Sequence, residues 1–169
     1  MNGPVRTDPG LQAALAAYPG SVTAFLEERS GEPVVATGRR HRSLTADGPG
    51  PLGLEPGAPM VERAALLCGG RSGRPYLAAT SLLAVGRLPA EVIERLATGP
   101  EPIGRVLAEH GLGVARTPLS GPPPTAVPPR PDGDTVVLAR TQLLTVAGVA
   151  VVVVTEWFLS AVLALLDSD

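Results

Sequence analysis

The sequence predicts a single α+β domain with a mostly antiparallel sheet. Several extended apolar runs follow one another through short turns, a pattern typical of antiparallel strands, and helical segments lie before and between them. The hydrophobic content of 44% and the formal net charge of −2 favour a globular chain over a disordered one. The 39 glycine and proline residues therefore separate the elements of one domain rather than marking a disordered chain.

The N-terminal part of the chain predicts two helices and a strand. Residues 11–18 are apolar at helical spacing, and Ser21 is a suitable N-cap for a second helix over residues 22–29. A strand is expected over residues 33–37. Residues 46–59 hold four glycines and four prolines and predict a loop.

The middle of the chain predicts a hairpin followed by two helices. Its expected elements are strands over 61–68 and 76–85 joined by a turn over 69–73, a helix opened by Pro89, and a short helix from Pro102 to His110. Residues 118–133 hold seven prolines and two glycines, which predicts an irregular loop or a flexible flap.

The C-terminal part predicts a long hairpin, with strands over 135–145 and 149–158 around a turn at Ala147-Gly148. The run over 143–166 has 24 residues and a single charge, a length that could also cross a membrane. Residues 149–154 are mostly β-branched, and Glu156 would be costly inside a bilayer. A buried strand followed by a short helix is therefore the preferred interpretation, and no membrane partner is expected.

Composition and motifs exclude several functional classes. The pI of about 5.7 gives no overall basic field for binding nucleic acid. Cys68 is the only cysteine, and His41 and His110 are far apart, so no metal site is expected. Residues 1–10 lack the apolar core of a signal peptide, which indicates a cytoplasmic protein. The basic cluster over 39–42 is more typical of a solvated strand end than of a phosphate site.

Two charged residues stand out because they lie in apolar runs. Arg63 precedes Ala64-Ala65-Leu66-Leu67, and Glu156 lies between a valine run and Trp157-Phe158-Leu159. A buried charge requires a partner, so one interpretation is a structural Arg–Glu pair, or side chains on the solvent face of their strands. The alternative is an enclosed pocket, in which the arginine holds a carboxylate and burial raises the pKa of the glutamic acid.

Short motifs resemble the chorismate pyruvate-lyase (4-hydroxybenzoate synthase) family in order along roughly residues 11–166. The matching segments are Ser21-Val22-Thr23, Arg63 followed by Leu66-Leu67-Cys68, Tyr76-Leu77-Ala78, Pro102-Ile103-Gly104-Arg105 and Thr155-Glu156-Trp157-Phe158-Leu159. The last two are the most specific.

The resemblance implies a fold in which the sheet and helical flaps enclose a small-molecule pocket. It also implies conversion of chorismate to 4-hydroxybenzoate and pyruvate, without a cofactor or metal. Arg63 would hold the ring carboxylate and Glu156 would meet the 4-hydroxyl, as the two catalytic residues. The substrate-binding set implied by the resemblance is Val22, Arg63, Ile103, Gly104, Arg140 and Glu156.

Two other functions remain open from the sequence. One is a non-catalytic sensor that binds an aromatic acid, although the roughly ten residues before the first helix are too few for a DNA-binding module. The other is a related lyase or isomerase acting on another chorismate-like cyclic acid, because Val22 stands where the family often has a larger apolar residue.

Overall fold

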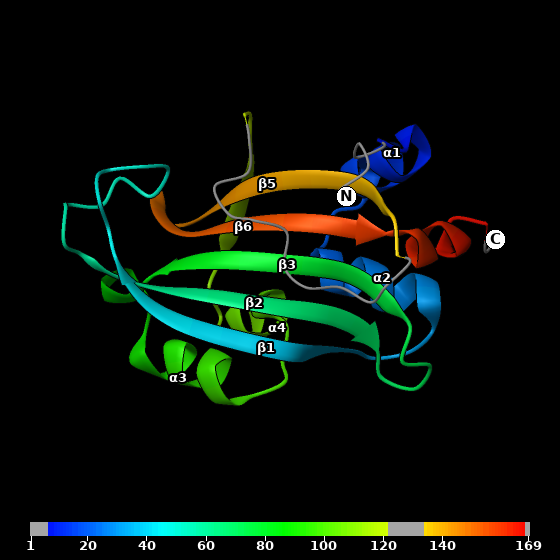
Figure 1. Ribbon diagram of the computed structural model, residues 1–169, viewed down its shortest axis with the longest axis horizontal. Coiled ribbons are helices and arrows are strands. Elements are labelled where there is room, and N and C mark those ends of the chain that lie inside the picture. Colours follow the sequence, from blue (N-terminus) through cyan, green and yellow to red (C-terminus); the bar gives the residue numbers. More distant parts are fainter. Residues whose placement is uncertain (1–6, 122–133, 168–169) are drawn as a thin grey trace.

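The computed structural model describes residues 7–121 and 134–167. Within them, six antiparallel strands form one sheet in the order β1-β2-β3-β6-β5-β4 (Figure 1). The strands are β1 (Val34–Thr45), β2 (Pro59–Gly69), β3 (Pro75–Ala84), β4 (Val114–Leu119), β5 (Val136–Val146) and β6 (Val149–Leu159). The α+β class and the antiparallel sheet predicted from the sequence are confirmed.

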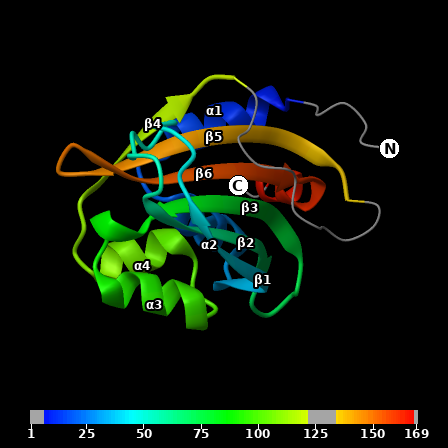
Figure 2. The same cartoon turned by 60° about the vertical axis from the view of Figure 1, so that its left-hand side comes forward.

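Two helices precede β1, two lie between β3 and β4, and all four pack against one face of the sheet (Figures 1 and 2). They are α1 (Pro9–Ala17), α2 (Val22–Ser30), α3 (Ala90–Thr98) and α4 (Ile103–Glu109), with 3-10 turns at Val85–Arg87 and Ser160–Leu165. The predicted start of α2 is confirmed, because the Ala24 N–H donates to Ser21 Oγ at 3.1 Å. Gly31 ends this helix with a φ of 72°, in the left-handed region that glycine favours.

Two separate hydrophobic clusters hold the helices to the sheet. The first lies under α1 and α2, where Phe25 and Leu26 pack with Leu77 of β3 and Phe158 of β6. The second lies under α3 and α4, with core residues Leu83, Val92, Leu96, Val106, Leu107, Leu144 and Val152.

The opposite face of the sheet is covered in part by residues 46–58, which form no helix or strand. Leu52 and Leu54 from this segment are buried against Val153. Arg87 fixes the segment by donating to the carbonyl oxygens of Leu52 at 2.6 Å and Gly53 at 3.1 Å. The predicted loop thus contributes two buried leucines to the core, and Pro59 already belongs to β2.

The apolar run over 143–166 is divided among β5, β6 and the last 3-10 turn. Ala147 and Gly148 adopt positive φ angles of 51° and 79° in the tight turn between the strands. The predicted hairpin is therefore confirmed. Across the described ranges, no helix combines the length and hydropathy needed to span a bilayer.

Two sequence predictions need correction. The first strand continues to Thr45 instead of ending at residue 37, so the basic cluster over 39–42 lies within it. Strand β4 was not expected, and it includes Pro118 and Leu119, where an irregular segment was predicted. Because β4 is an edge strand paired only with β5, a residue without an N–H donor is tolerated there. Residues 122–133 of the expected flap lie outside the described residues.

Candidate functional site

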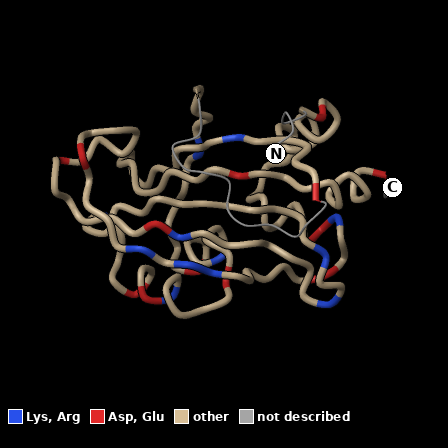
Figure 3. Tube along the Cα trace, in the orientation of Figure 1, with Lys and Arg blue, Asp and Glu red and all other residues tan. Residues whose placement is uncertain are grey.

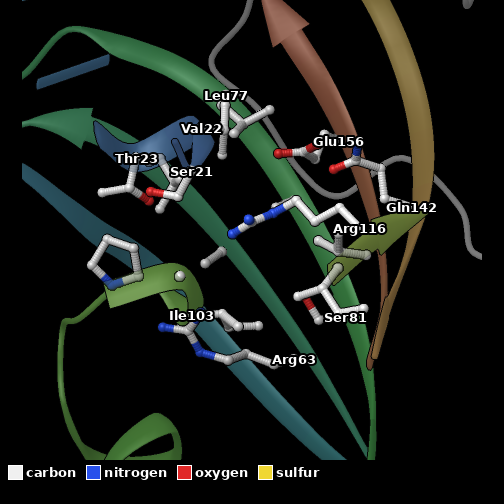
Figure 4. A pocket seen from close by; sticks show the side chains of 17 residues that line it. Ser21, Val22, Thr23, Arg63, Leu77, Ser81, Ile103, Arg116, Gln142 and Glu156 are labelled. Carbon is white, nitrogen blue, oxygen red and sulfur yellow. The ribbon is translucent and has the colours of Figure 1, made fainter. Parts of the chain in front are cut away.

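A pocket opens on the helix-covered face of the sheet, between the two hydrophobic clusters. It encloses about 620 Å³ of space not filled by atoms, part of which is open to solvent. Its floor comes from β2, β3, β5 and β6, its rim from β4, and its helical wall from the starts of α2 and α4. Figure 4 shows side chains from these elements pointing into the same space.

Strand alternation explains why distant residues share this face. Arg63 pairs with Ser81, and their neighbours two residues along the strands, Ala65 and Ala79, also pair. Ala79 in turn lies opposite Glu156. Because successive side chains of a strand point to opposite faces, these pairs project into the pocket together.

Arg63 is buried, with 4% of its surface exposed. Its Nε donates to the Leu96 carbonyl at 3.3 Å, and Nη2 donates to the Glu101 carbonyl at 2.8 Å. Within the described part of the chain, no carboxylate lies within ion-pair distance of its guanidinium. Burial, with a smaller contribution from Arg39, lowers the pKa of Arg63 to about 10, so the side chain stays positively charged at neutral pH.

Glu156 is buried as well, but it has a charged partner. Arg140 Nε on the neighbouring strand donates to Glu156 Oε1 at 2.7 Å. The Arg140 guanidinium also lies 5.4 Å from the centre of the Phe158 ring, which fixes its position further. The structural Arg–Glu pair considered from the sequence therefore exists for Glu156, with Arg140 and not Arg63 as the partner.

Arg116 on β4 is a second arginine that lines the pocket. It lies opposite Leu144 in the sheet register, and its Nη2 is 3.8 Å from the position that a Cβ on Gly104 would take. The side chain stays open to solvent, yet the pocket walls desolvate its guanidinium. This desolvation lowers the pKa of Arg116, while Glu156 raises it and Arg140 lowers it.

The helical wall of the pocket depends on a close approach of α2 and α4. A Cβ on Gly104 would lie 3.3 Å from Ser21 Cβ, so only a residue without a side chain fits here easily. Arg105 Nη2 also donates to Glu27 Oε1 of α2 at 2.6 Å. Arg105, the last residue of the Pro102–Arg105 motif, thus connects the two helices.

The structure brings most of the site residues named from the sequence to one place. Val22, Arg63, Ile103, Gly104 and Glu156 line the pocket. Arg140 lies behind Glu156 as its ion-pair partner.

Sequence reasoning missed several other lining residues: Thr23, Ser81, Arg116 and Gln142. An alternating pattern could have indicated Ser81 and Gln142, two residues along their strands from other inward-facing positions.

The basic cluster over 39–42 makes structural contacts, since Arg39 donates to the Gly99 carbonyl and Arg42 pairs with Glu62 at 3.1 Å. In the part of the chain that the structure covers, no three His, Cys, Asp or Glu side chains gather as a metal site.

Comparison with known proteins finds similarity of fold but not of sequence family. No protein-family model matches the chain, and no curated protein matches its sequence. The solved structure of PhnF from Mycobacterium smegmatis matches with a TM-score of 0.59 and 16% identity, over 86% of this chain and 66% of that chain. A putative GntR-family transcriptional regulator matches with a TM-score of 0.47 and 18% identity, over 94% of this chain and 64% of that chain. This chain thus spans just under two thirds of each matched protein.

The match to PhnF corrects the sequence interpretation. The expected enzyme, a chorismate lyase, is contradicted, because the fold is shared with PhnF, a transcriptional regulator and not a lyase. The resemblance to chorismate lyases holds for the fold, which has the expected sheet and helices, and it extends no further.

Proposed function

We propose that this chain is a non-catalytic sensor domain that binds a small organic anion in the pocket, with Arg63 as the residue that holds the anionic group. The observation that carries the proposal is the state of Arg63, a buried cation whose two hydrogen bonds go to main-chain carbonyls. The fold shared with PhnF supports a ligand-binding role for the domain.

The energetics of Arg63 favour an anionic ligand. Carbonyl oxygens satisfy the donors at Nε and Nη2 but supply no full negative charge. A guanidinium has five N–H donors in a planar fork that matches a carboxylate. A bound carboxylate would therefore neutralise a charge that the described part of the chain leaves without a counterion, in a site where burial strengthens the attraction.

The rest of the lining favours a ligand with an apolar body. Leu67, Leu77, Ile103, Leu144 and Val154 face the pocket from five different elements. A few polar groups among apolar walls are typical of sites that enclose most of a small molecule. A planar aromatic acid, with its carboxylate at Arg63 and its ring among these side chains, fits this arrangement.

Calorimetric titration with benzoate and with benzamide tests the proposal. These probes share a ring and differ in charge, so the wild-type protein is expected to bind benzoate and to bind benzamide far more weakly. The Arg63→Gln substitution is expected to weaken benzoate binding by about tenfold or more, because a charged hydrogen bond contributes about 1.5–3 kcal/mol. Arg40→Gln, which alters an exposed arginine of β1, is the matched control and is expected to change nothing.

The outcome that contradicts the proposal is equally clear. Equal binding of benzoate and benzamide would show that charge is not recognised. Binding of benzoate that survives Arg63→Gln in a folded variant would show that another residue holds the carboxylate. Release of a chemically altered product would contradict the sensor role.

A further inference from the structure

We propose that the ligand carries two separate anionic groups, and that Arg116 binds the second one at the β4 rim of the pocket. This inference rests on the proposed function, since it names the class of ligand for the same pocket. It assigns a binding role to a residue that the motif analysis did not reach.

The first argument is the charge of the pocket. Three guanidinium groups lie in or against it, those of Arg63, Arg116 and Arg140, and one carboxylate, that of Glu156. The Arg140–Glu156 ion pair is neutral as a unit. Arg63 and Arg116 have no ion pair with any described carboxylate. A ligand with one negative charge would leave one of these two cations without a counterion.

The second argument is that the two cations come from different parts of the sheet. Arg63 projects from β2 and donates to the carbonyls of Leu96 and Glu101. Arg116 projects from β4, on the other side of the sheet order, and its charged influences are Glu156 and Arg140. Figure 4 likewise shows the two side chains entering the pocket from different strands.

The third argument is that Arg116 has no structural task that would explain its position. Within the described residues its side chain makes no hydrogen bond or ion pair, although its guanidinium lies beside Gly104 at the start of α4. An arginine free to remain fully in water instead accepts partial desolvation at the pocket. An anionic group bound there would compensate this cost. It would also hold one end of the ligand against the edge strand β4.

The test compares terephthalate with 4-carbamoylbenzoate by calorimetric titration. The two molecules have the same ring and the same first carboxylate, and the second carboxylate is replaced by a neutral amide. Wild-type protein is expected to bind terephthalate about tenfold more tightly, the scale of one additional charged hydrogen bond. The Arg116→Gln variant is expected to remove this advantage while changing the affinity for 4-carbamoylbenzoate by less than about twofold. Arg116→Lys is expected to restore part of it, because a lysine keeps the charge without the planar fork.

An additional ligand and the possible outcomes distinguish a second anion subsite from a structural role of Arg116. 4-Carboxyphenyl phosphate, measured in parallel, shows whether the group at Arg116 is better matched by phosphate or by carboxylate, and tighter binding of either dianion than of 4-carbamoylbenzoate supports the inference. If 4-carbamoylbenzoate binds through Arg63 and neither dianion binds more tightly, the second subsite is absent and the proposed function stands. An equal loss of both ligands in Arg116→Gln would identify a merely structural role and overturn the inference. If no aromatic acid binds at all, both proposals fail together.

Discussion

The two walls of the pocket stabilise their buried charges in different ways. On the β2 wall, the Arg63 guanidinium is hydrogen-bonded to two main-chain carbonyls and has no counterion among the described residues. On the β5–β6 wall, the Glu156 carboxylate forms an ion pair with Arg140 at 2.7 Å. Both side chains are buried to a similar degree, with 4% and 3% of their surface exposed. The difference therefore lies in charge compensation and not in burial.

This difference separates residues that hold the fold from residues that remain available to a ligand. A compensated pair contributes to stability only as long as both partners remain, and removing one leaves an expensive charge behind. A hydrogen-bonded but uncompensated cation costs stability in the free protein and recovers it when an anion binds. Figure 3 shows that charged residues are sparse along the central strands, so each of these few charges has a large influence on its surroundings.

The largest expected effect comes from breaking the Arg140–Glu156 ion pair of the β5–β6 wall. Arg140→Met should lower the free energy of unfolding by about 3 kcal/mol, because it leaves the Glu156 carboxylate buried without its partner. Denaturant unfolding followed by the fluorescence of Trp157, the only tryptophan, measures this loss.

The double variant Arg140→Met with Glu156→Leu provides the control. It should recover most of the lost stability, since two apolar side chains can replace a buried ion pair at little cost. Arg63→Gln should lose clearly less than Arg140→Met, because it removes an uncompensated charge together with its hydrogen bonds. Equal losses for Arg63→Gln and Arg140→Met would contradict the distinction between the two walls.

The next effect concerns the pH dependence of ligand binding on the β2 wall. Anion binding requires the protonated form of Arg63, whose pKa burial lowers to about 10. Benzoate affinity should therefore stay constant between roughly pH 6 and 9. It should fall by about tenfold near pH 11, one unit above the pKa of Arg63 in the ligand-free protein. Titrations at each pH, with Trp157 fluorescence showing that the protein remains folded, measure this profile.

Arg63→Lys sharpens the same experiment. Lysine has an ordinary pKa of about 10.4, and burial would lower it further, so binding to this variant should weaken at a lower pH than in the wild type. If affinity fell with the same midpoint in both proteins, the titrating group would lie elsewhere.

Much of the fold could be predicted from local signals, and the exception shows their limit. The final hairpin was accessible because Ala147-Gly148 interrupts two β-rich runs, and the resulting turn has the positive φ angles that such a turn requires. Strand β4 was not accessible, because Pro118 lies in a proline-rich context that normally predicts a loop. Only its pairing with β5 makes this segment a strand.

In the site, too, local sequence signals identified some residues, whereas features that depend on strand pairing were not predictable. Arg63 and Glu156 could be singled out because a charge within an apolar run needs a partner or a purpose. The partner of Glu156 could not be identified, because the Arg140–Glu156 contact depends on the register of β5 and β6, and a shift of one residue would place Arg140 on the opposite face. The position of Arg116 at the pocket likewise depends on the register of β4 against β5, and β4 was not expected from the sequence.

The smallest expected effect comes from a second ion pair, between α2 and α4, which extends the comparison to a partly exposed environment. Arg105 of α4 pairs with Glu27 of α2 at 2.6 Å, with 29% and 30% of their side chains exposed. Arg105→Ala should lower the free energy of unfolding by only about 0.5 kcal/mol, because water screens a pair of this exposure, and high salt should reduce the effect further. Glu27→Ala should cost more, since Glu27 Oε2 also accepts the Val34 N–H at 3.1 Å. Denaturant unfolding of the two variants at low and high salt measures both effects. A loss for Arg105→Ala as large as that for Arg140→Met would mean that burial does not set the strength of these pairs.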